Sequence, residues 1–460
     1  MQLNIPRLLI SAPASGSGKT TLTCAIMAAL KKRGLAVASF KCGPDYIDPM
    51  FHRRVVGTKS RNLDLFFTDP ATTRGLLDAG SRDCDIAIIE GGMGFYDGIA
   101  VSDESSAWDI AHTTKTPVVL VVDARGRSLS IAAEVEGYAR FRDESMIAGV
   151  IFNHAKPGVY HNLKDLIQQE TGIPVFGYLP KMEDCGLESR HLGLVAPDEV
   201  DQLSRKVERL AEAVQECIDL DALIGLAGVA PVIEGPDLPF SDVEADDGPR
   251  IAVAQDSAFS FYYRENLLLL DKLGAEIVPF SPLSDTALPA DIDGLYLGGG
   301  YPENHARRLS ENTEMRAAVR RAVHAGMPTI AECGGFEYLN AELEGTDGAV
   351  YPMAGVFDGT VLRTDKLQRF GYITMEARED SMIARAGERI PAHEYHYWDV
   401  KNPGDAFDVD KPQSTRRWQA GFVSDTLYAG FPHLYFYANP QMAKRFVDAC
   451  NAYQLTRLAE

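Results

Sequence analysis

The feature that most constrains the fold is a glycine-rich loop between a strand pattern and a helix pattern near the N-terminus. Residues 7–12 form the apolar run RLLISA, residues 12–20 read APASGSGKT, and residues 20–34 follow a helical pattern that a glycine closes. A strand, a loop ending in Gly-Lys-Thr and a helix, in this order, are the context of a phosphate-binding loop. The backbone N–H groups of such a loop and the positive end of its helix hold phosphates.

This phosphate-binding loop predicts a nucleotide site. Gly16, Gly18, Lys19 and Thr20 would hold the phosphates, with Lys19 on the β- and γ-phosphates and the Thr20 hydroxyl on Mg²⁺. Pro13 stands where a first glycine is usual, but that glycine only shapes the entry to the loop. The alternative is an ordinary Gly/Ser-rich turn, which the flanking strand and helix disfavour.

Acidic residues follow two further strand patterns. Glu90 ends the apolar run of residues 85–92, DIAIIEGG, at the place where open α/β sheets put their sites, and Asp97 follows in the same glycine-rich stretch. Asp45 and Asp48 stand three apart in GPDYIDP and could converge on Mg²⁺ or on a substrate group being phosphorylated. The alternatives are a helix cap or solvated acids for Glu90 and Asp97, and a Pro-Asp turn for the pair.

A cysteine stands on a second strand-to-helix turn, in the stretch TIAECGGFEYL of residues 329–339. A nucleophile there lies at a helix N-terminus, which lowers the pKa of a thiol, and the glycines after it let N–H groups face an oxyanion. Cys333 is therefore a candidate nucleophile, with Gly334 beside it. A buried structural cysteine is the alternative.

Two further segments could complete a thiol site. The run YLGGGYPE at 296–303 ends a strand in glycines, and Gly299 and Gly300 could supply the other oxyanion donor. A general base could be His433, about 100 residues beyond the cysteine, or one of the pair His393 and His396. Residue types alone leave this choice open.

The arrangement of these patterns predicts two α/β domains. A chain of 460 residues exceeds one ordinary core. Short apolar runs alternate with helical patterns in the first half, as in βα units on a parallel sheet, and the alternation restarts at RIAVAQD. The predicted segments are a phosphate-binding-loop domain, an acidic linker rich in Pro, Gly and Asp, and a second α/β domain that carries the cysteine turn, at residues 1–233, 234–249 and 250–460.

Composition limits the partners. The formal net charge of −20 argues against nucleic acid, whereas the basic stretch of residues 41–62 could still serve an anionic small molecule. No apolar run reaches about 18 residues, and the N-terminal segment lacks a charged region before its apolar run, so we expect neither a membrane span nor a signal peptide. Seven cysteines without close pairing favour the reducing cytoplasm. A homo-oligomer is compatible with the sequence.

The motifs taken together resemble one family. They are PASGSGKTT, FKCGPDYIDPMFH, RNLD, EGGMGFYDG, RHLGL, LGGGYPE, AECGGFEYL and HEYHY, and they extend from about residue 7 to residue 447. This combination resembles cobyrinate a,c-diamide synthases, which are glutamine-dependent amidotransferases of cobalamin biosynthesis. The resemblance implies a first domain similar to dethiobiotin synthetase and a second domain similar to class I-type glutaminases.

The resemblance also implies an activity. The second domain would release ammonia from L-glutamine, and the first would use ATP and Mg²⁺ to convert a carboxylate of a tetrapyrrole polycarboxylate into an acyl phosphate. Ammonia then displaces phosphate and leaves a primary amide, on carboxylates a and c of cobyrinate. Because a free carboxylate has no adequate leaving group, the two chemistries need each other.

The resemblance assigns roles to residues of this chain. Cys333 becomes the nucleophile and His433 the base, although Tyr435 stands where common class I enzymes have an acid, so the third member of the triad is either absent or supplied from elsewhere. Lys41, His52 and Arg61 are weaker candidates for contacts to the polycarboxylate rim. The ATP loop becomes Gly16, Ser17, Gly18, Lys19, Thr20 and Thr21; the metal ligands Thr20, Glu90 and Asp48; and the residues of acyl-phosphate chemistry Asp45, Asp48 and Asp97.

Alternatives remain at the level of substrate and class. Sister enzymes would carry out the same chemistry on hydrogenobyrinate or on nickel-sirohydrochlorin, and motifs do not separate them. Cobyric acid synthase shares the domain plan, but GPDYIDP favours the a,c-diamide branch. A regulatory ATPase with an inactive glutaminase-like module is the alternative from another class, and the retained Cys333 and His433 count against it.

Overall fold

The computed structural model describes residues 2–187, 197–240 and 248–459. The chain forms two compact units, Met1–Leu238 and Pro239–Glu460. The motif RHLGL and most of the acidic part of the expected linker lie outside the described residues. Among the helices that the structure describes, none is both long and apolar enough to cross a membrane.

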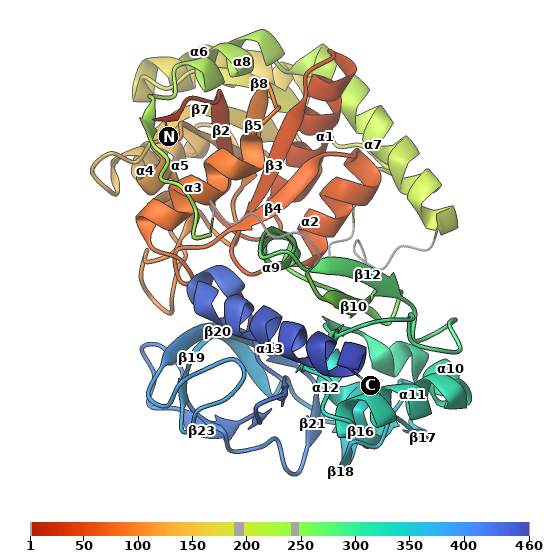
Figure 1. Ribbon diagram of the computed structural model, residues 1–460. Helices are drawn as coiled ribbons and strands as arrows, with labels where there is room; N and C mark the ends of the chain where they lie inside the picture. The colour runs from red at the N-terminus through yellow and green to blue at the C-terminus, as the bar shows by residue number, and fades with distance from the viewer. Residues whose placement is uncertain (1, 188–196, 241–247, 460) are drawn as a thin grey trace. The chain divides into compact units, whose positions relative to one another are not determined.

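The first unit is built on a parallel sheet of seven strands (Figure 1). Neighbouring strands all run parallel, as the alternation of strand and helix patterns predicts. In spatial order the strands are β4 (Lys59–Leu63), β3 (Val37–Cys42), β5 (Ile86–Glu90), β2 (Arg7–Ser11), β6 (Val118–Asp123), β7 (Ile147–Asn153) and β8 (Val175–Leu179).

Both faces of this sheet are buried, which explains the near-continuous apolar runs of its strands. Leu8 and Ile10 of β2 pack in a core with α1 (Lys19–Lys32), α7 (Pro197–Cys217) and α8 (Leu220–Gly228), and Leu9, which points to the opposite face, is also fully buried. The other helices of this unit are α2 (Ile47–Phe51), the π-helical turn η1 (His52–Val56), α3 (Pro70–Ser81), α4 (Ala107–Thr114), α5 (Ser130–Arg140) and α6 (Pro157–Thr171). A small antiparallel pair joins β1 (Gln2–Leu3) and β9 (Ile233–Glu234).

The carboxyl ends of the central strands meet at one edge of the sheet. The phosphate-binding loop follows β2, Glu90 ends β5, Asp123 ends β6 and Asn153 ends β7. Polar groups from segments far apart in sequence therefore lie at the edge where open α/β sheets bind ligands.

The second unit contains a six-stranded sheet that is parallel except for its last strand. Its order is β12 (Glu276–Phe280), β10 (Arg250–Ala254), β13 (Gly294–Leu297), β15 (Thr329–Glu332), β25 (Leu427–Gly430) and β24 (Phe422–Val423). The helices of this unit are α9 (Arg264–Lys272), η2 (Pro302–His305), α10 (Ala306–Glu311), α11 (Thr313–His324), α12 (Gly334–Leu339), η3 (Phe436–Ala438) and α13 (Pro440–Ala459). The expected fold class, two α/β units with parallel sheets, is confirmed.

Two smaller sheets follow the cysteine turn, and the sequence patterns did not predict them. One contains β17 (Val350–Pro352), β16 (Asn340–Glu344), β18 (Phe357–Arg363) and β21 (Trp398–Val400). The other is antiparallel and contains β23 (Arg417–Ala420), β22 (Phe407–Asp410), β19 (Arg369–Ala377), β20 (Arg389–His396) and β26 (His433–Leu434). The second sheet places His433 beside His393 in register.

Two element boundaries differ from the local sequence patterns. Residues 261–274 follow a helical pattern, but α9 begins only at Arg264, because β11 (Phe259–Phe261) is a strand. That strand pairs with β14 (Gly299–Gly300), so the run of residues 293–300 is divided between β13 and β14. The glycine run thereby leaves the main sheet and turns toward the cysteine.

Candidate active sites

The phosphate-binding loop has the backbone conformation that its glycines permit. Gly16 and Gly18 have φ values of 79° and 89°, a region that residues with a Cβ rarely adopt, and Gly18 caps the N-terminus of α1. Lys19 folds back so that its Nζ donates to the Ala14 carbonyl at 3.0 Å. Burial of the ammonium, with Lys41 nearby, lowers the pKa of Lys19 to about 8. The lysine thus covers a carbonyl of its own loop.

Asn153, at the end of β7, anchors this loop and was missed by the sequence reasoning. Its Nδ2 donates to the Ser17 carbonyl at 2.9 Å. A Cβ built on Gly18 would lie 2.0 Å from that Nδ2, so the close approach requires glycine. The sequence could have indicated it, because Asn153 is a polar residue at the carboxyl end of an apolar run, as Glu90 is.

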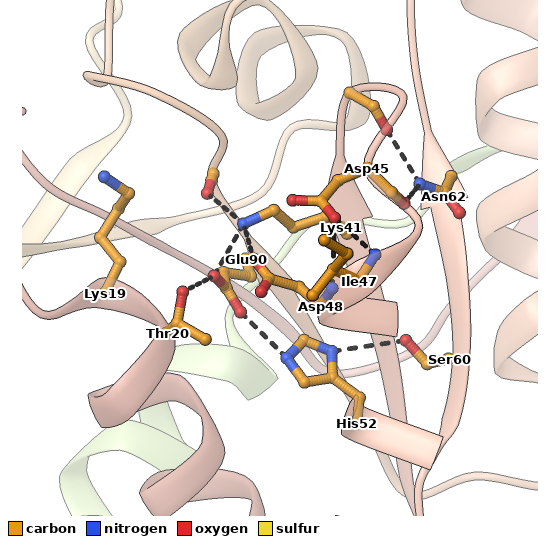
Figure 2. Close-up of polar contacts among 12 residues, drawn as sticks. Lys19, Thr20, Lys41, Asp45, Ile47, Asp48, His52, Ser60, Asn62 and Glu90 are labelled. Atoms are coloured by element: carbon orange, nitrogen blue, oxygen red, sulfur yellow. Dashed lines mark hydrogen bonds and ion pairs between the residues drawn. The ribbon is translucent and has the colours of Figure 1, made fainter. Parts of the chain in front are cut away.

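A buried charge cluster of Lys41, Asp48, His52 and Glu90 lies beside the loop (Figure 2). Lys41 Nζ lies 2.7 Å from Glu90 Oε1 and 2.6 Å from Asp48 Oδ2. His52 Nε2 lies 3.0 Å from the other Glu90 oxygen, Oε2. Thr20 connects the cluster to the loop, because its hydroxyl donates to Glu90 Oε1 at 2.6 Å.

The pKa values of the two carboxyl groups of the cluster, Glu90 and Asp48, are shifted in opposite directions, because their charged neighbours differ. Burial alone would raise the pKa of Glu90, but Lys41 and His52 hold it well below its usual range. Burial and the neighbouring Asp45 carboxylate raise the pKa of Asp48 above its ordinary value, against the opposing effect of Lys41. Glu90 is therefore the anionic centre of the cluster.

The structure brings together some of the predicted residues and not others. The three predicted metal ligands are linked through Glu90 and Lys41, and their hydroxyl and carboxylate oxygens suit a hard cation such as Mg²⁺. Asp45 instead accepts the N–H groups of Ile47 and Asp48 at 2.7 and 3.2 Å, as in a Pro-Asp turn. Asp97 is exposed and accepts the Gly94 N–H at 2.9 Å.

The expectation for the basic residues needs correction. Lys41 and His52 are buried in the cluster, and His52 has no exposed surface, so neither presents a solvent-facing group to the rim of a polycarboxylate substrate. Their hydrogen-bonding capacity is directed at Glu90, which explains their burial. Arg61, on β4, is half-buried, and Thr21 is a half-buried residue in the first turn of α1.

In the second unit, Cys333 occupies the turn between β15 and α12. Its φ of 47° and ψ of −106° are unusual for a residue other than glycine, as at a strained nucleophile turn. Its N–H donates to the Gly430 carbonyl at 2.8 Å, and its Sγ lies 4.0 Å from the Tyr395 carbonyl oxygen. The turn therefore holds the thiol in one position.

The expected lowering of the thiol pKa is wrong. Burial raises the pKa of Cys333 well above its ordinary value, and the carboxyl groups of Glu337 and Glu303 add to the rise. Both carboxyl groups are themselves buried, and burial raises the pKa of Glu303 to about 7. Desolvation and nearby acids thus outweigh the effect of the six-residue helix α12.

The glycines of both loops pack closely around this turn. A Cβ on Gly299 would lie 2.4 Å from Cε1 of His433, so the glycine makes room for the imidazole. A Cβ on Gly334 would lie 3.1 Å from the backbone nitrogen of Gly300, which places the two predicted oxyanion segments side by side. The structure thus gathers Gly299, Gly300, Gly334 and His433 around Cys333.

Among the three histidines, contacts favour His433 as the base. Both ring nitrogens of His396 have partners, the Trp398 carbonyl at 2.6 Å and Glu394 Oε1 at 3.1 Å. Burial lowers the pKa of His433 to about 3 and that of His393 to about 4, so both rings are neutral at pH 7. Only His433 packs against the glycine loop in the described contacts.

Comparisons with known proteins agree with this division. Residues 8–194 match the CobQ/CobB/MinD/ParA nucleotide binding domain, and residues 250–441 match the CobB/CobQ-like glutamine amidotransferase domain. A protein of Caldanaerobacter subterraneus named cobyrinate a,c-diamide synthase is 40% identical over 449 residues, which cover 97% of this chain and 98% of the relative. The chain belongs to the cobyrinate a,c-diamide synthase family.

Other members are similar over equal lengths. A cobyrinate a,c-diamide synthase of Listeria monocytogenes is 40% identical over 459 residues, covering 96% of this chain and 99% of the relative. One of Thermoplasma volcanium is 39% identical over 461 residues and covers 99% of both chains. These relatives therefore match both units of this chain.

Proposed function

We propose that this chain amidates the a and c carboxylates of cobyrinate, with ATP as the activating nucleotide and L-glutamine as the source of ammonia. The observation that carries the proposal is that relatives of this name match almost the whole chain, while one chain holds both a phosphate-binding loop and a cysteine turn. An isolated regulatory ATPase would have no use for the second site.

In the glutaminase half, Cys333 attacks the amide carbon of glutamine while His433 takes the thiol proton. The backbone N–H groups near Gly299, Gly300 and Gly334 would face the developing oxyanion. His433 returns the proton to the leaving nitrogen, so ammonia departs and a thioester remains. Water, deprotonated by His433, then hydrolyses the thioester to glutamate and restores the thiol.

In the synthetase half, the phosphate-binding loop from Gly16 to Thr21 would hold ATP. A substrate carboxylate oxygen attacks the γ-phosphorus, ADP leaves, and ammonia then attacks the acyl carbon and expels phosphate. Lys19 would release the Ala14 carbonyl and turn to the phosphates. Asp45, Asp48 and Asp97 stay proposed contributors to the acyl-phosphate step.

Thr20, Glu90 and Asp48 would hold Mg²⁺. When bound, Mg²⁺ would neutralise phosphate charge and favour departure of ADP. Thr20 already contacts Glu90, and Glu90 and Asp48 both contact Lys41, which supports this ligand set. Because Lys41 balances both carboxylates in this structure, its ammonium would have to give way when the cation binds.

The experiment that tests the function is a substrate panel. Purified enzyme is incubated with ATP, glutamine and either cobyrinate, hydrogenobyrinate or nickel-sirohydrochlorin, and the products are identified by mass. The proposal predicts two amidations of cobyrinate. Preference for another of these tetrapyrroles would change the substrate but not the chemistry, and amidation of none of them would contradict the proposal.

A further inference from the structure

A third buried acid, besides Glu303 and Glu337, lies beside the cysteine turn and has no role in the proposed mechanism. Glu332 is the last residue of β15 and directly precedes Cys333. Its side chain is 1% exposed, and its carboxyl group contacts the backbone of the residue after His433. A carboxyl group placed there requires an explanation, because an acid is costly to bury without partners.

The contacts of Glu332 join the cysteine turn to the histidine strand. Its Oε1 accepts the N–H of Leu434 at 3.1 Å, and its Oε2 accepts the Tyr296 hydroxyl at 3.2 Å. The same Oε2 lies 3.9 Å from Nδ1 of His433. That distance exceeds a hydrogen bond, but such contacts are often long before substrate binds.

Asn266, on α9, holds the other side of the histidine strand. Its Nδ2 donates to the Leu434 carbonyl at 2.7 Å, and its Oδ1 accepts the Phe436 N–H at 2.8 Å. The backbone on both sides of Leu434 is thus fixed by side chains from other elements. Because Glu332 accepts the Leu434 N–H, its carboxyl group is held next to the imidazole of His433.

We propose that Glu332 is a positioning residue that orients His433 through Nδ1 and stabilises the imidazolium formed when His433 takes the thiol proton. With Glu332 at Nδ1, the proton from the thiol would be taken by Nε2. In common class I enzymes an acid two residues after the histidine does this, and Tyr435 stands there in this chain. Glu332 supplies the missing carboxylate from the residue before the nucleophile. The inference rests on the proposed glutaminase function.

The charges of the two groups support each other. Burial raises the pKa of Glu332 to about 8 and lowers that of His433 to about 3, so each charge alone is disfavoured. A carboxylate beside an imidazolium relieves both penalties. His393 and His396 add to the lowering of the His433 pKa. The other titratable groups that face Glu332 are the hydroxyls whose pKa values it raises, those of Tyr262, Tyr296 and Tyr428.

The test compares Glu332→Gln, which keeps shape and an acceptor oxygen but removes the charge, with Glu332→Asp and with Tyr296→Phe. We expect Glu332→Gln to lower kcat for glutamine hydrolysis about 100-fold or more, with little change in KM. Glu332→Asp should recover part of the rate. Tyr296→Phe removes a neutral hydroxyl that donates to Oε2 but leaves the carboxyl group in place, so it should lower kcat much less than Glu332→Gln does.

The pH dependence of kcat separates positioning from a structural role. The ionisation of Glu332 should produce the acid limb of the wild-type profile, and Glu332→Gln should lack that limb. A merely structural loss would lower the rate by the same factor at every pH. Ammonia-supported synthesis and the unfolding midpoint should stay near wild type and so report that the variant folds.

Two results separate the failure of this inference from that of the proposed function. If Cys333→Ala abolishes glutamine hydrolysis but Glu332→Gln leaves kcat and its pH profile unchanged, the role of Glu332 is refuted and the glutaminase stands. If Cys333→Ala retains full hydrolysis, the proposed function itself fails.

Discussion

Lys41 Nζ lies 2.7 Å from Glu90 Oε1, and both side chains are almost completely buried (Figure 2). The same ammonium lies 2.6 Å from Asp48, so a single lysine balances two carboxylates beside the phosphate-binding loop. The pKa of Lys41 is raised well above its ordinary value, because these carboxylates outweigh the effect of burial. We therefore expect the stability of the first unit to depend on this lysine.

Replacing Lys41 with methionine should destabilise the protein. Removal of one partner leaves a buried charge without compensation, which typically costs about 3–5 kcal/mol. Denaturant unfolding of the full-length chain would measure the loss. The matched control is Lys444→Met, which breaks an exposed pair with Asp448 and should cost only about 0–1 kcal/mol. Equal losses in both variants would show that the buried pair has no special role.

Cys333 should react slowly with iodoacetamide in the absence of glutamine. Burial raises the pKa of its thiol well above the ordinary value of 9.0, so the protonated form persists at neutral pH. The rate of alkylation should therefore rise only when the pH exceeds 9, because the thiolate is the nucleophile. Alkylation resolved by peptide mass spectrometry measures this, with the more exposed Cys217 as the internal reference. Reaction of Cys333 as fast as Cys217 at pH 7 would contradict the burial argument.

Substitution of Gly299 with alanine should remove glutaminase activity and spare the synthetase. The new Cβ would meet the His433 ring at 2.4 Å, so the base or the glycine strand must shift. A misplaced catalytic group commonly costs about 100-fold in rate. Glutamine hydrolysis and ammonia-supported synthesis are measured side by side. Gly137→Ala, where a Cβ meets nothing within 4 Å, serves as the control and should leave both rates unchanged.

Removal of the Asn153 side chain should weaken nucleotide binding. Its amide holds the Ser17 carbonyl, so Asn153→Ala frees the loop and adds an ordering cost when ATP binds. We expect Kd for ATP to rise about tenfold, which corresponds to roughly 1.4 kcal/mol, measured by calorimetry. Gln441→Ala, at an exposed residue in the other unit, should leave the affinity unchanged. A wild-type Kd for Asn153→Ala would show that the loop is rigid without this contact.

Much of the fold could be predicted because its signals are local. The central strands β2, β5 and β6 of the first sheet are buried on both faces, so each is a nearly continuous apolar run whose ends can be predicted to within a few residues. The hairpin of β19 and β20 carries no such run, because polar residues such as His393 and Glu394 interrupt it. Its existence depends on pairing along the sheet, which no local pattern specifies.

Some residues of the candidate sites could likewise be identified from adjacent sequence, and others could not. Lys19 and Cys333 stand in turns whose chemistry is local, and their neighbours in sequence identify them. Glu332 stands next to the cysteine in the sequence, yet its proposed role depends on its contact with Leu434, about 100 residues away. The raised thiol pKa likewise follows from burial and from Glu303, which a helix-terminus argument does not include. The proposed role of Glu332 and the raised pKa of Cys333 both depend on contacts between segments that are far apart in the sequence.

The most direct test of the account is amide formation on cobyrinate by the Cys333→Ala variant, with ATP and either glutamine or ammonium as the nitrogen source. We predict that the variant makes no amide from glutamine and makes the a,c-diamide from ammonium at the wild-type rate. Synthesis from glutamine that survives in Cys333→Ala would contradict the account, because ammonia would then come from another site.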